Sequence, residues 1–290
     1  MIVDLPYEVR LEDKRLVEGW AQQRLPFDPK DGWKKDFKVE LGAAIRRLVA
    51  GPHEGLHATY TNPQTDRVDI ENALIYNVGT SAFRNSAHTQ LKFERSFDAP
   101  ASPRAHLEHY YRYEIVPLSE PLSAWRRGSS LVDWSSRLAS LSFDTKAAVV
   151  WWATKHGEIK THVDSPHAGW FGLQLEVEAP ETAGNLADFV KPLTDGAIAA
   201  LQSHAPGPDL AELAERVARS LGVNPAAVAQ ALCDESTAVL SGNRILWKRG
   251  IGVQWNPADE RCVAGILRRT GSSSAEWVVR GKLFHPDPRS

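Results

Sequence analysis

The chain has 290 residues, of which 42% are hydrophobic, and this is enough apolar material for one large domain or two small ones. A formal net charge of −2 excludes a strongly basic nucleic-acid-binding protein, so any contact with DNA requires a local basic patch. Two cysteines provide neither a disulfide framework nor zinc-ligand spacing, there is no signal-peptide hydrophobic segment, and no apolar run approaches ~18 residues. These features predict a cytoplasmic protein with no membrane partner.

The first part of the chain is predicted to alternate helices and strands. Residues 1–32 are polar and irregular. The helical spacing of Trp33, Phe37, Leu41 and Leu48 predicts an amphipathic helix that ends before Gly51. In chain order we expect a helix over 12–23, a helix over 33–49, and strands over 55–61, 90–96 and 109–116.

An acidic segment, Asp69-Ile70-Glu71-Asn72, follows the strand over 55–61 and begins an apolar stretch. At a junction between a loop and a helix, two carboxylates two positions apart can converge on one cation. Neighbouring residues on a regular strand point to opposite faces instead. The alternative is that Asp69 only caps a helix.

A loop rich in proline and serine over 117–130 is the best candidate boundary between two halves of the chain. It predicts a first half over residues 1–125 and a second over 126–290. The second half is expected to contain a short helix over 131–141, an apolar segment over 147–154 that length assigns to neither helix nor strand, and a strand over 171–179.

The strand over 171–179 alternates apolar and polar residues, and after Pro180 the apolar period becomes helical. On the other face of this helix Asp188, Lys191 and Asp195 share one stripe. Because proline is tolerated near a helix start, Pro192 predicts that the helix begins close to Asp188. Lys191 is then expected to pair with Asp188 or Asp195, or to contact a phosphate.

This strand, short loop and Lys-Pro-x-x-Asp helix resemble the core motif of the RusA family of Holliday-junction resolvases, which reads roughly Asp-Leu-Asp-Asn-Leu-x-Lys-Pro-x-x-Asp. The segment 252–263, with its acidic pair Asp259-Glu260, is similar to the second acidic element of that family. The first two family acids align with Asn185 and Ala187, so the pair that would hold a metal is absent from this copy.

The acidic segment near residue 69 keeps the acid-x-acid-Asn spacing but has Ile75 where the lysine would be. Pro63 precedes Asp69 by six positions, and Pro180 precedes Asn185 by five. This recurrence predicts an internal duplication, although convergence between short strand–loop–helix units is the alternative. Since RusA enzymes are homodimers, the resemblance implies two halves that fold as a pseudo-dimer.

Residues 207–235 are predicted to form a helical hairpin inserted in the second half. Its spacing resembles a helix-turn-helix, but its second helix has no Arg or Lys for phosphate or guanine, so we expect Val228 and Leu232 to be buried in a structural hairpin. Strands are expected over 244–255, 261–270 and 276–284.

The predicted fold is therefore α+β, with two related strand-and-helix halves and this helical hairpin. The resemblance implies a divergent nuclease-like protein that acts on or recognises branched DNA and uses Mg²⁺. Its expected metal ligands are Asp69, Glu71, Asp259 and Glu260, and its expected catalytic residues are Asp69, Glu71, Asp259 and Lys191. The rival function is a non-catalytic interaction or scaffold protein with a protein partner. The net charge favours the rival, and the paired Asp69 and Glu71 favour the enzyme.

Overall fold

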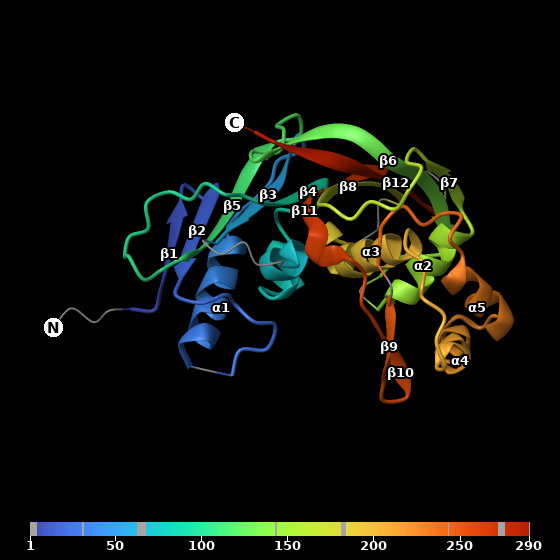
Figure 1. Cartoon of the computed structure of the whole chain (residues 1–290). Helices are drawn as coiled ribbons and strands as arrows, with labels where there is room; N and C mark the ends of the chain where they lie inside the picture. Colours follow the sequence, from blue (N-terminus) through green and yellow to red (C-terminus); the bar gives the residue numbers. More distant parts are fainter. Residues whose placement is uncertain are drawn as a thin grey trace.

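A computed structural model describes residues 5–30, 32–62, 68–142, 144–180, 184–242, 244–271 and 276–289. The described residues form an α+β fold in which a mixed sheet arches over a layer of helices (Figure 1). Among these residues, no helix is long and apolar enough to cross a bilayer.

The large sheet has the strand order β1-β2-β5-β3-β4-β11-β8-β12-β6-β7. Its strands are β1 (Tyr7–Glu12), β2 (Leu16–Ala21), β3 (Glu54–Thr61), β4 (Gln90–Arg95), β5 (His109–Pro117), β6 (Trp125–Leu138), β7 (Glu158–Thr161), β8 (Phe171–Ala179), β11 (Cys262–Gly271) and β12 (Trp277–Pro288). A separate hairpin is formed by β9 (Leu246–Arg249) and β10 (Gly252–Trp255).

Five helices and three short turns complete the described elements. The helices are α1 (Gly32–Ile45), α2 (Ala147–Lys155), α3 (Leu186–Ala200), α4 (Leu210–Leu221) and α5 (Pro225–Cys233). The short turns are η1 (Asn72–Tyr76), η2 (Thr80–Phe83) and η3 (Asp259–Arg261).

The two halves of the large sheet repeat the same strand neighbours. In the first half β3 is parallel to β4 and antiparallel to β5, which pairs with β2. In the second half β8 is parallel to β11 and antiparallel to β12, which pairs with β6. The antiparallel pair β4–β11 joins the halves. The order β2-α1-β3-β4-β5 therefore matches β6-α2-β8-β11-β12, as an approximate two-fold requires. An origin by duplication stays a prediction, as does the boundary after residue 125, which falls at the first residue of β6.

The main core lies between the sheet and the helices. Alternate residues of β8, among them Phe171 and Leu173, are fully buried, while Gln174 lies on the other face. α3 presents Leu186, Phe189 and other apolar residues to this core. Burying one such large side chain stabilises the fold by roughly 1.5–3 kcal/mol. The apolar period changes after Pro180 because the chain passes from a strand of the sheet layer to a helix of the helical layer.

Two predicted helices are strands. Residues 12–23 contain β2 and the turn from β1, in which Asp13 and Lys14 have positive φ angles of 44° and 57°. Residues 131–141 lie largely within β6, which pairs with both β12 and β7. In each case the apolar spacing is partly helical, but pairing with a distant strand makes the segment β. A local sequence pattern carries no information about that pairing.

Two further segments are helices. The segment over 147–154, which the sequence assigned to neither helix nor strand, forms α2. The helix expected to begin near Asp188 begins earlier, at Leu186, so Pro192 lies inside α3 rather than in its first turn. Pro192 has no N–H to donate to the carbonyl four residues before it, and the buried apolar face of α3 offsets that loss.

The predicted helical hairpin consists of α4 and α5. Val228 and Leu232 are fully buried, as expected, and pack in a cluster that includes Trp151 of α2. Gly222 ends α4 in the left-handed conformation, with φ of 71°, which glycine adopts without steric cost. The hairpin therefore uses its apolar face to attach to the body of the protein.

Candidate functional site

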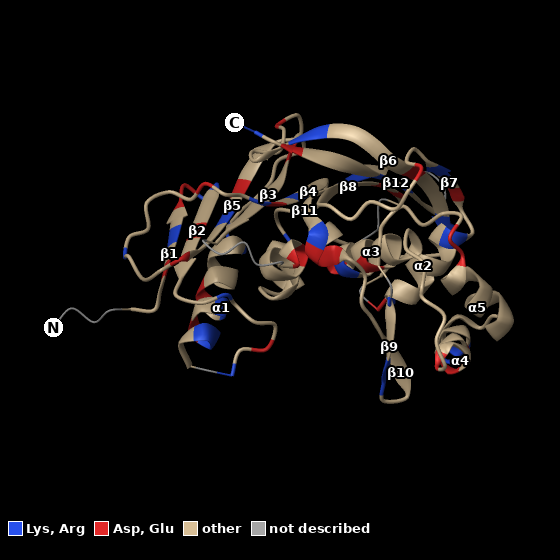
Figure 2. Ribbon diagram, viewed as in Figure 1, with Lys and Arg blue, Asp and Glu red and all other residues tan. Residues whose placement is uncertain are grey.

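Lys191 of α3 lies at the centre of four carboxylates. Its Nζ atom lies 2.8 Å from Asp195 Oδ1, 3.1 Å from Asp69 Oδ2, 3.3 Å from Asp259 Oδ2 and 3.6 Å from Glu71 Oε2. We call these five residues the Lys191 cluster. Figure 2 shows charged residues of both signs gathered around α3 and η3, beneath the central strands of the sheet.

The cluster is assembled from three separate segments. Asp69 and Glu71 precede η1 in the first half of the chain, Lys191 and Asp195 lie one turn apart on α3, and Asp259 begins η3 just before β11. Four of the residues expected from the sequence, Asp69, Glu71, Lys191 and Asp259, thus meet in space.

Asp69 has two roles in this arrangement. Its Oδ1 accepts a hydrogen bond of 2.9 Å from the backbone N–H of Asn72, as a helix-capping residue does. Its Oδ2 accepts one from Lys191 Nζ at 3.1 Å. The capping expected as an alternative is therefore present, and it leaves the second oxygen available to the cluster.

Glu71 is the most deeply buried acid of the cluster. Its side chain is 5% exposed, and within the described structure neither carboxylate oxygen has a hydrogen-bond donor. Its carboxylate forms an ion pair with the Lys191 ammonium group. Leaving a buried carboxylate without hydrogen-bond donors is costly, and the ion pair with Lys191 compensates only part of that cost.

Burial and mutual repulsion change the acidities of the cluster. Burial raises the pKa of Glu71 well above its usual range, that of Asp195 to about 6 and that of Asp259 to about 8. Burial alone would lower the pKa of Lys191, but the surrounding carboxylates raise it well above its usual value. At neutral pH the ammonium group therefore stays charged, while the acids around it do not all carry a full charge.

Glu260 is not brought into the cluster. It follows Asp259 in the tight turn η3, but it lines a different pocket, which also contains Gln202, Ser241 and Arg244. Adjacent residues of such a turn point in different directions, so the sequence neighbours are separated. Asp195 joins the cluster instead. Its signal in the sequence was the i, i+4 spacing from Lys191, which indicated an ion pair and not membership of a larger site.

Asn185, which aligns with a family acid, has a structural role. Its Oδ1 accepts a hydrogen bond of 2.8 Å from the N–H of Ala187, and its Nδ2 donates one of 2.8 Å to the Phe83 carbonyl. Asparagine can accept and donate at once, whereas a carboxylate can only accept. The residue thus starts α3 and attaches it to η2, and Ala187 is buried.

The donor chemistry of the cluster fits Mg²⁺, which prefers carboxylate oxygens, and the unpartnered carboxylate of Glu71 favours a cation. As their side chains stand, however, no three Asp, Glu, His or Cys residues of the described structure are placed to hold one ion together. The ammonium group of Lys191 lies among the carboxylates and provides the positive charge there.

Comparison of this chain with protein-family models, with curated proteins and with solved structures found no match.

Proposed function

We propose that this chain is a Mg²⁺-dependent nuclease-like protein that acts on branched DNA. The observation that carries the proposal is the meeting of Asp69, Glu71 and Asp259 around Lys191, from segments up to 190 residues apart in sequence. Cleavage of a phosphodiester requires carboxylates that hold a divalent cation and a positive group close to the phosphate.

The residues of the cluster divide these tasks. With their side chains turned toward one point, Asp69, Glu71 and Asp259 would hold Mg²⁺, and the bound ion would supply activation of water and neutralisation of the leaving oxygen. Lys191 supplies the positive charge that binds and orients the phosphate. Asp195, one helical turn away at 2.8 Å, holds the Lys191 side chain in place.

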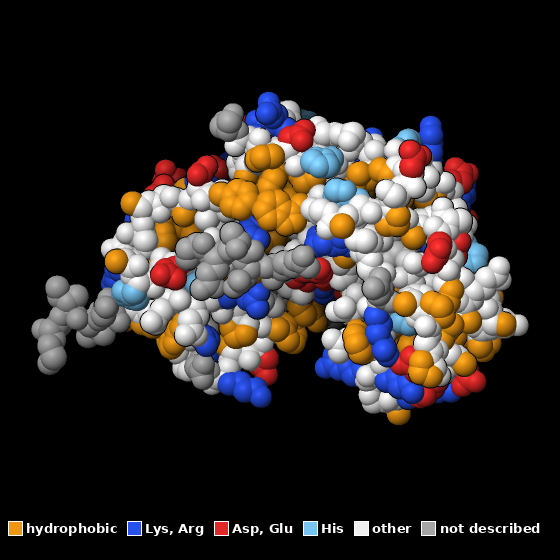
Figure 3. Space-filling view, in the orientation of Figure 1, with side chains coloured by type: hydrophobic (Ala, Val, Ile, Leu, Met, Phe, Trp, Pro, Cys, Tyr) orange, Lys and Arg blue, Asp and Glu red, His pale blue; other side chains and the backbone are white. Residues whose placement is uncertain are grey.

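Two features support DNA as the substrate. In the space-filling view of Figure 3, Lys and Arg side chains lie on both sides of the acidic group at the centre of the face shown. The repeated topology and the central β4–β11 pair also give one chain the arrangement of two paired subunits, which suits a branched substrate with related arms.

The rival function, a non-catalytic interaction or scaffold protein, is favoured by one observation. Lys191 already contacts four carboxylates, and Asp69 caps η1, so the cluster also works as an ion network that holds α3 to the first half. In this reading the site contributes stability and no chemistry.

Cleavage of a labelled four-way DNA junction tests the proposal. We expect cleavage in Mg²⁺ or Mn²⁺ and its loss in Asp69→Asn, because asparagine retains the capping oxygen but removes the ligand charge. Asp188→Asn is the matched control, since Asp188 lies on α3 outside the cluster. If the wild-type protein neither cleaves nor binds junctions in either metal, the scaffold function replaces this proposal.

A further inference from the structure

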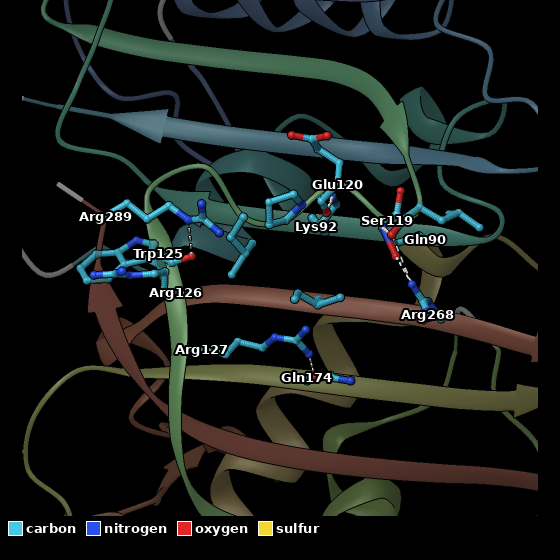
Figure 4. Close-up of a pocket in the computed structure, with 14 residues that line it drawn as sticks. Gln90, Lys92, Ser119, Glu120, Trp125, Arg126, Arg127, Gln174, Arg268 and Arg289 are labelled. Atoms are coloured by element: carbon cyan, nitrogen blue, oxygen red, sulfur yellow. Dashed lines mark hydrogen bonds between the residues drawn. The ribbon is translucent and has the colours of Figure 1, made fainter.

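A pocket of about 420 Å³ lies on the outer face of the sheet, opposite the helices (Figure 4). Residues alternate along each strand, so Leu91 of β4 and Leu173 of β8 enter the core while Lys92 and Gln174 line the pocket. The pocket spans β4, β11 and β8 and thus includes strands of both halves. It is separated from the Lys191 cluster by the sheet.

The pocket is strongly basic although the chain has a net charge of −2. Its lining contains five basic side chains and one acidic one, which are Lys92, Arg126, Arg127, Arg268, Arg289 and Glu120. Figure 4 shows Arg268 and Arg289 at opposite ends of the pocket, with Glu120 on the far side from Arg127. The basic groups come from four segments, so the fold gathers them here.

None of the five basic side chains forms an ion pair with a described carboxylate. Their partners are neutral: Arg127 donates to Gln174 Oε1 at 2.6 Å, and Arg268 donates to Gln90 Oε1 at 3.2 Å and to the Leu118 carbonyl at 3.3 Å. Neutral acceptors orient these two guanidinium groups without neutralising their charge.

The remaining contacts follow the same pattern. Arg289 Nε donates to the Trp125 carbonyl at 3.2 Å, and Lys92 Nζ donates to the Glu120 carbonyl at 2.6 Å. Glu94 lies on the same face of β4 as Lys92. Its carboxylate instead accepts hydrogen bonds from His57 and from the backbone of Ser123.

Lys92 makes the strongest case for a ligand. The residue is 1% exposed, and burial lowers the pKa of its ammonium group. Its described hydrogen-bond acceptor is a backbone carbonyl, and the nearby carboxylates of Glu120 and Glu94 offset part of the effect of burial. A buried cation of this kind is stabilised further by an added anion. Two basic residues elsewhere on the outer face are paired, Arg280 with Glu178 at 3.0 Å and Lys282 with Asp133 at 3.2 Å.

We propose that this pocket binds a small organic di- or triphosphate of nucleotide size. A phosphate group carries about −1.5 to −2 charges at neutral pH, so two or three of them match the excess of basic groups, whereas a monocarboxylate would leave most of it uncompensated. Guanidinium groups bind phosphate oxygens in pairs. The volume lies within the roughly 300–1,000 Å³ of small-molecule sites. Leu122 and Ile266 give the organic part an apolar wall.

The surroundings of the pocket favour a small ligand over a nucleic-acid strand. The charges beyond the pocket alternate in sign, because Glu178 and Asp133 lie among the lysines and arginines of β12. A long polyanion would meet these carboxylates, while a small phosphate ester would contact only the basic recess.

Calorimetric titration of the full chain in the absence of divalent metal tests the assignment, with pyrophosphate, ADP, ATP and citrate as probes. We expect saturable binding of ADP or ATP, and at least a tenfold weaker affinity in Arg127→Gln and in Arg268→Gln. Arg219→Gln is the matched control, because Arg219 lies on α4 outside the pocket, and it should bind as the wild type does. Thermal unfolding of each variant verifies that it is folded.

The comparison of probes identifies the group that is recognised. Equal affinity for pyrophosphate and ADP indicates that the pocket contacts the phosphates alone. Tighter binding of ADP indicates that the pocket also contacts the nucleoside. Both results support the proposal. Citrate binding as tightly as ATP, no binding below about 1 mM, or unchanged affinity in both variants would overturn it. A DNA oligonucleotide that binds through Arg127 and Arg268 when ADP does not would also overturn it.

Discussion

Lys191 and Asp69 are 122 residues apart in the chain, and their Nζ and Oδ2 atoms lie 3.1 Å apart. One belongs to a helix of the second half and the other to the acidic segment of the first. Their contact therefore exists only when the two halves are docked through the central β4–β11 pair. Any activity of the cluster depends on this docking.

Lys191→Met should destabilise the fold by about 3–5 kcal/mol, because it leaves buried carboxylates without their cation. Excess Mg²⁺ should restore part of that loss if the acids can bind a metal. Urea unfolding with and without Mg²⁺ measures both effects. Lys155→Met is the control: this lysine is 1% exposed and pairs with the single carboxylate of Asp234, so its loss should not respond to Mg²⁺. An equal response in both variants would contradict metal binding by the cluster.

Asn185→Ala should cost more stability than Asn224→Ala. Both asparagines cap helices, and a lost cap costs about 1 kcal/mol. Asn185 is also buried and donates to the Phe83 carbonyl, which the substitution leaves without this donor at a further ~1–3 kcal/mol. Thermal or urea unfolding measures the difference. Equal losses would show that the contact with Phe83 contributes nothing.

Gly196→Ala should destabilise the packing of α2 against α3. A Cβ atom at Gly196 would lie 2.6 Å from both the Ala147 carbonyl oxygen and the Val150 Cβ. Such overpacking costs about 1–3 kcal/mol, more than the ~1 kcal/mol gained in helix propensity. In α1, Gly32→Ala meets no atom within 4 Å and should be neutral or stabilising. A stable Gly196→Ala variant would show that the two helices can separate without cost.

Glu94 should contribute stability that is lost in acid. Its buried carboxylate accepts a hydrogen bond of 2.7 Å from His57 Nε2 and one of 2.7 Å from the Ser123 N–H. Although burial acts in the opposite direction, these contacts lower the pKa of Glu94 in the folded state. Its contribution is therefore complete above the unfolded value of about 4.3 and disappears as the pH falls through the lower folded value.

Glu94→Gln should accordingly be less stable than the wild type by about 1–3 kcal/mol at neutral pH, and the difference should shrink below about pH 4. Unfolding curves over a pH series measure it. Glu178→Gln, which removes one partner of an exposed pair with Arg280, should change stability by less than about 1 kcal/mol. A pH-independent difference for Glu94→Gln would assign the effect to packing and not to charge.

The sequence predicted the parts of the fold whose pattern is local. The alternation from Phe171 onward predicted β8, and the period change predicted α3, because each has one face in the core. The hairpin over 207–235 followed in the same way from apolar spacing and from Asn224, which caps α5. The α+β class resulted from these elements together.

The pairing of distant strands was not available from the sequence. Residues 12–23 and 131–141 have partly helical spacing, but β2 pairs with the distant strand β5 and β6 pairs with the distant strand β12. The site shows the same limit. Lys191 and Asp69 were both predicted as site residues, but the sequence does not show that they lie in contact. Asp259 and Glu260 were predicted to share one site, whereas a tight turn directs their side chains apart.

The strand order also determines when the second half can form as the chain is synthesised. Both neighbours of β8, β11 and β12, begin at Cys262 and Trp277, whereas β8 itself ends at Ala179. At ribosomal rates of about 5–20 residues per second, this apolar strand stays without either neighbour for several seconds. The first half has all five of its own strands once Pro117 has emerged, and only β4 still lacks a neighbour, β11. Nascent chains that stop before β11 therefore carry an unpaired, aggregation-prone strand, and this interval is where a chaperone would act.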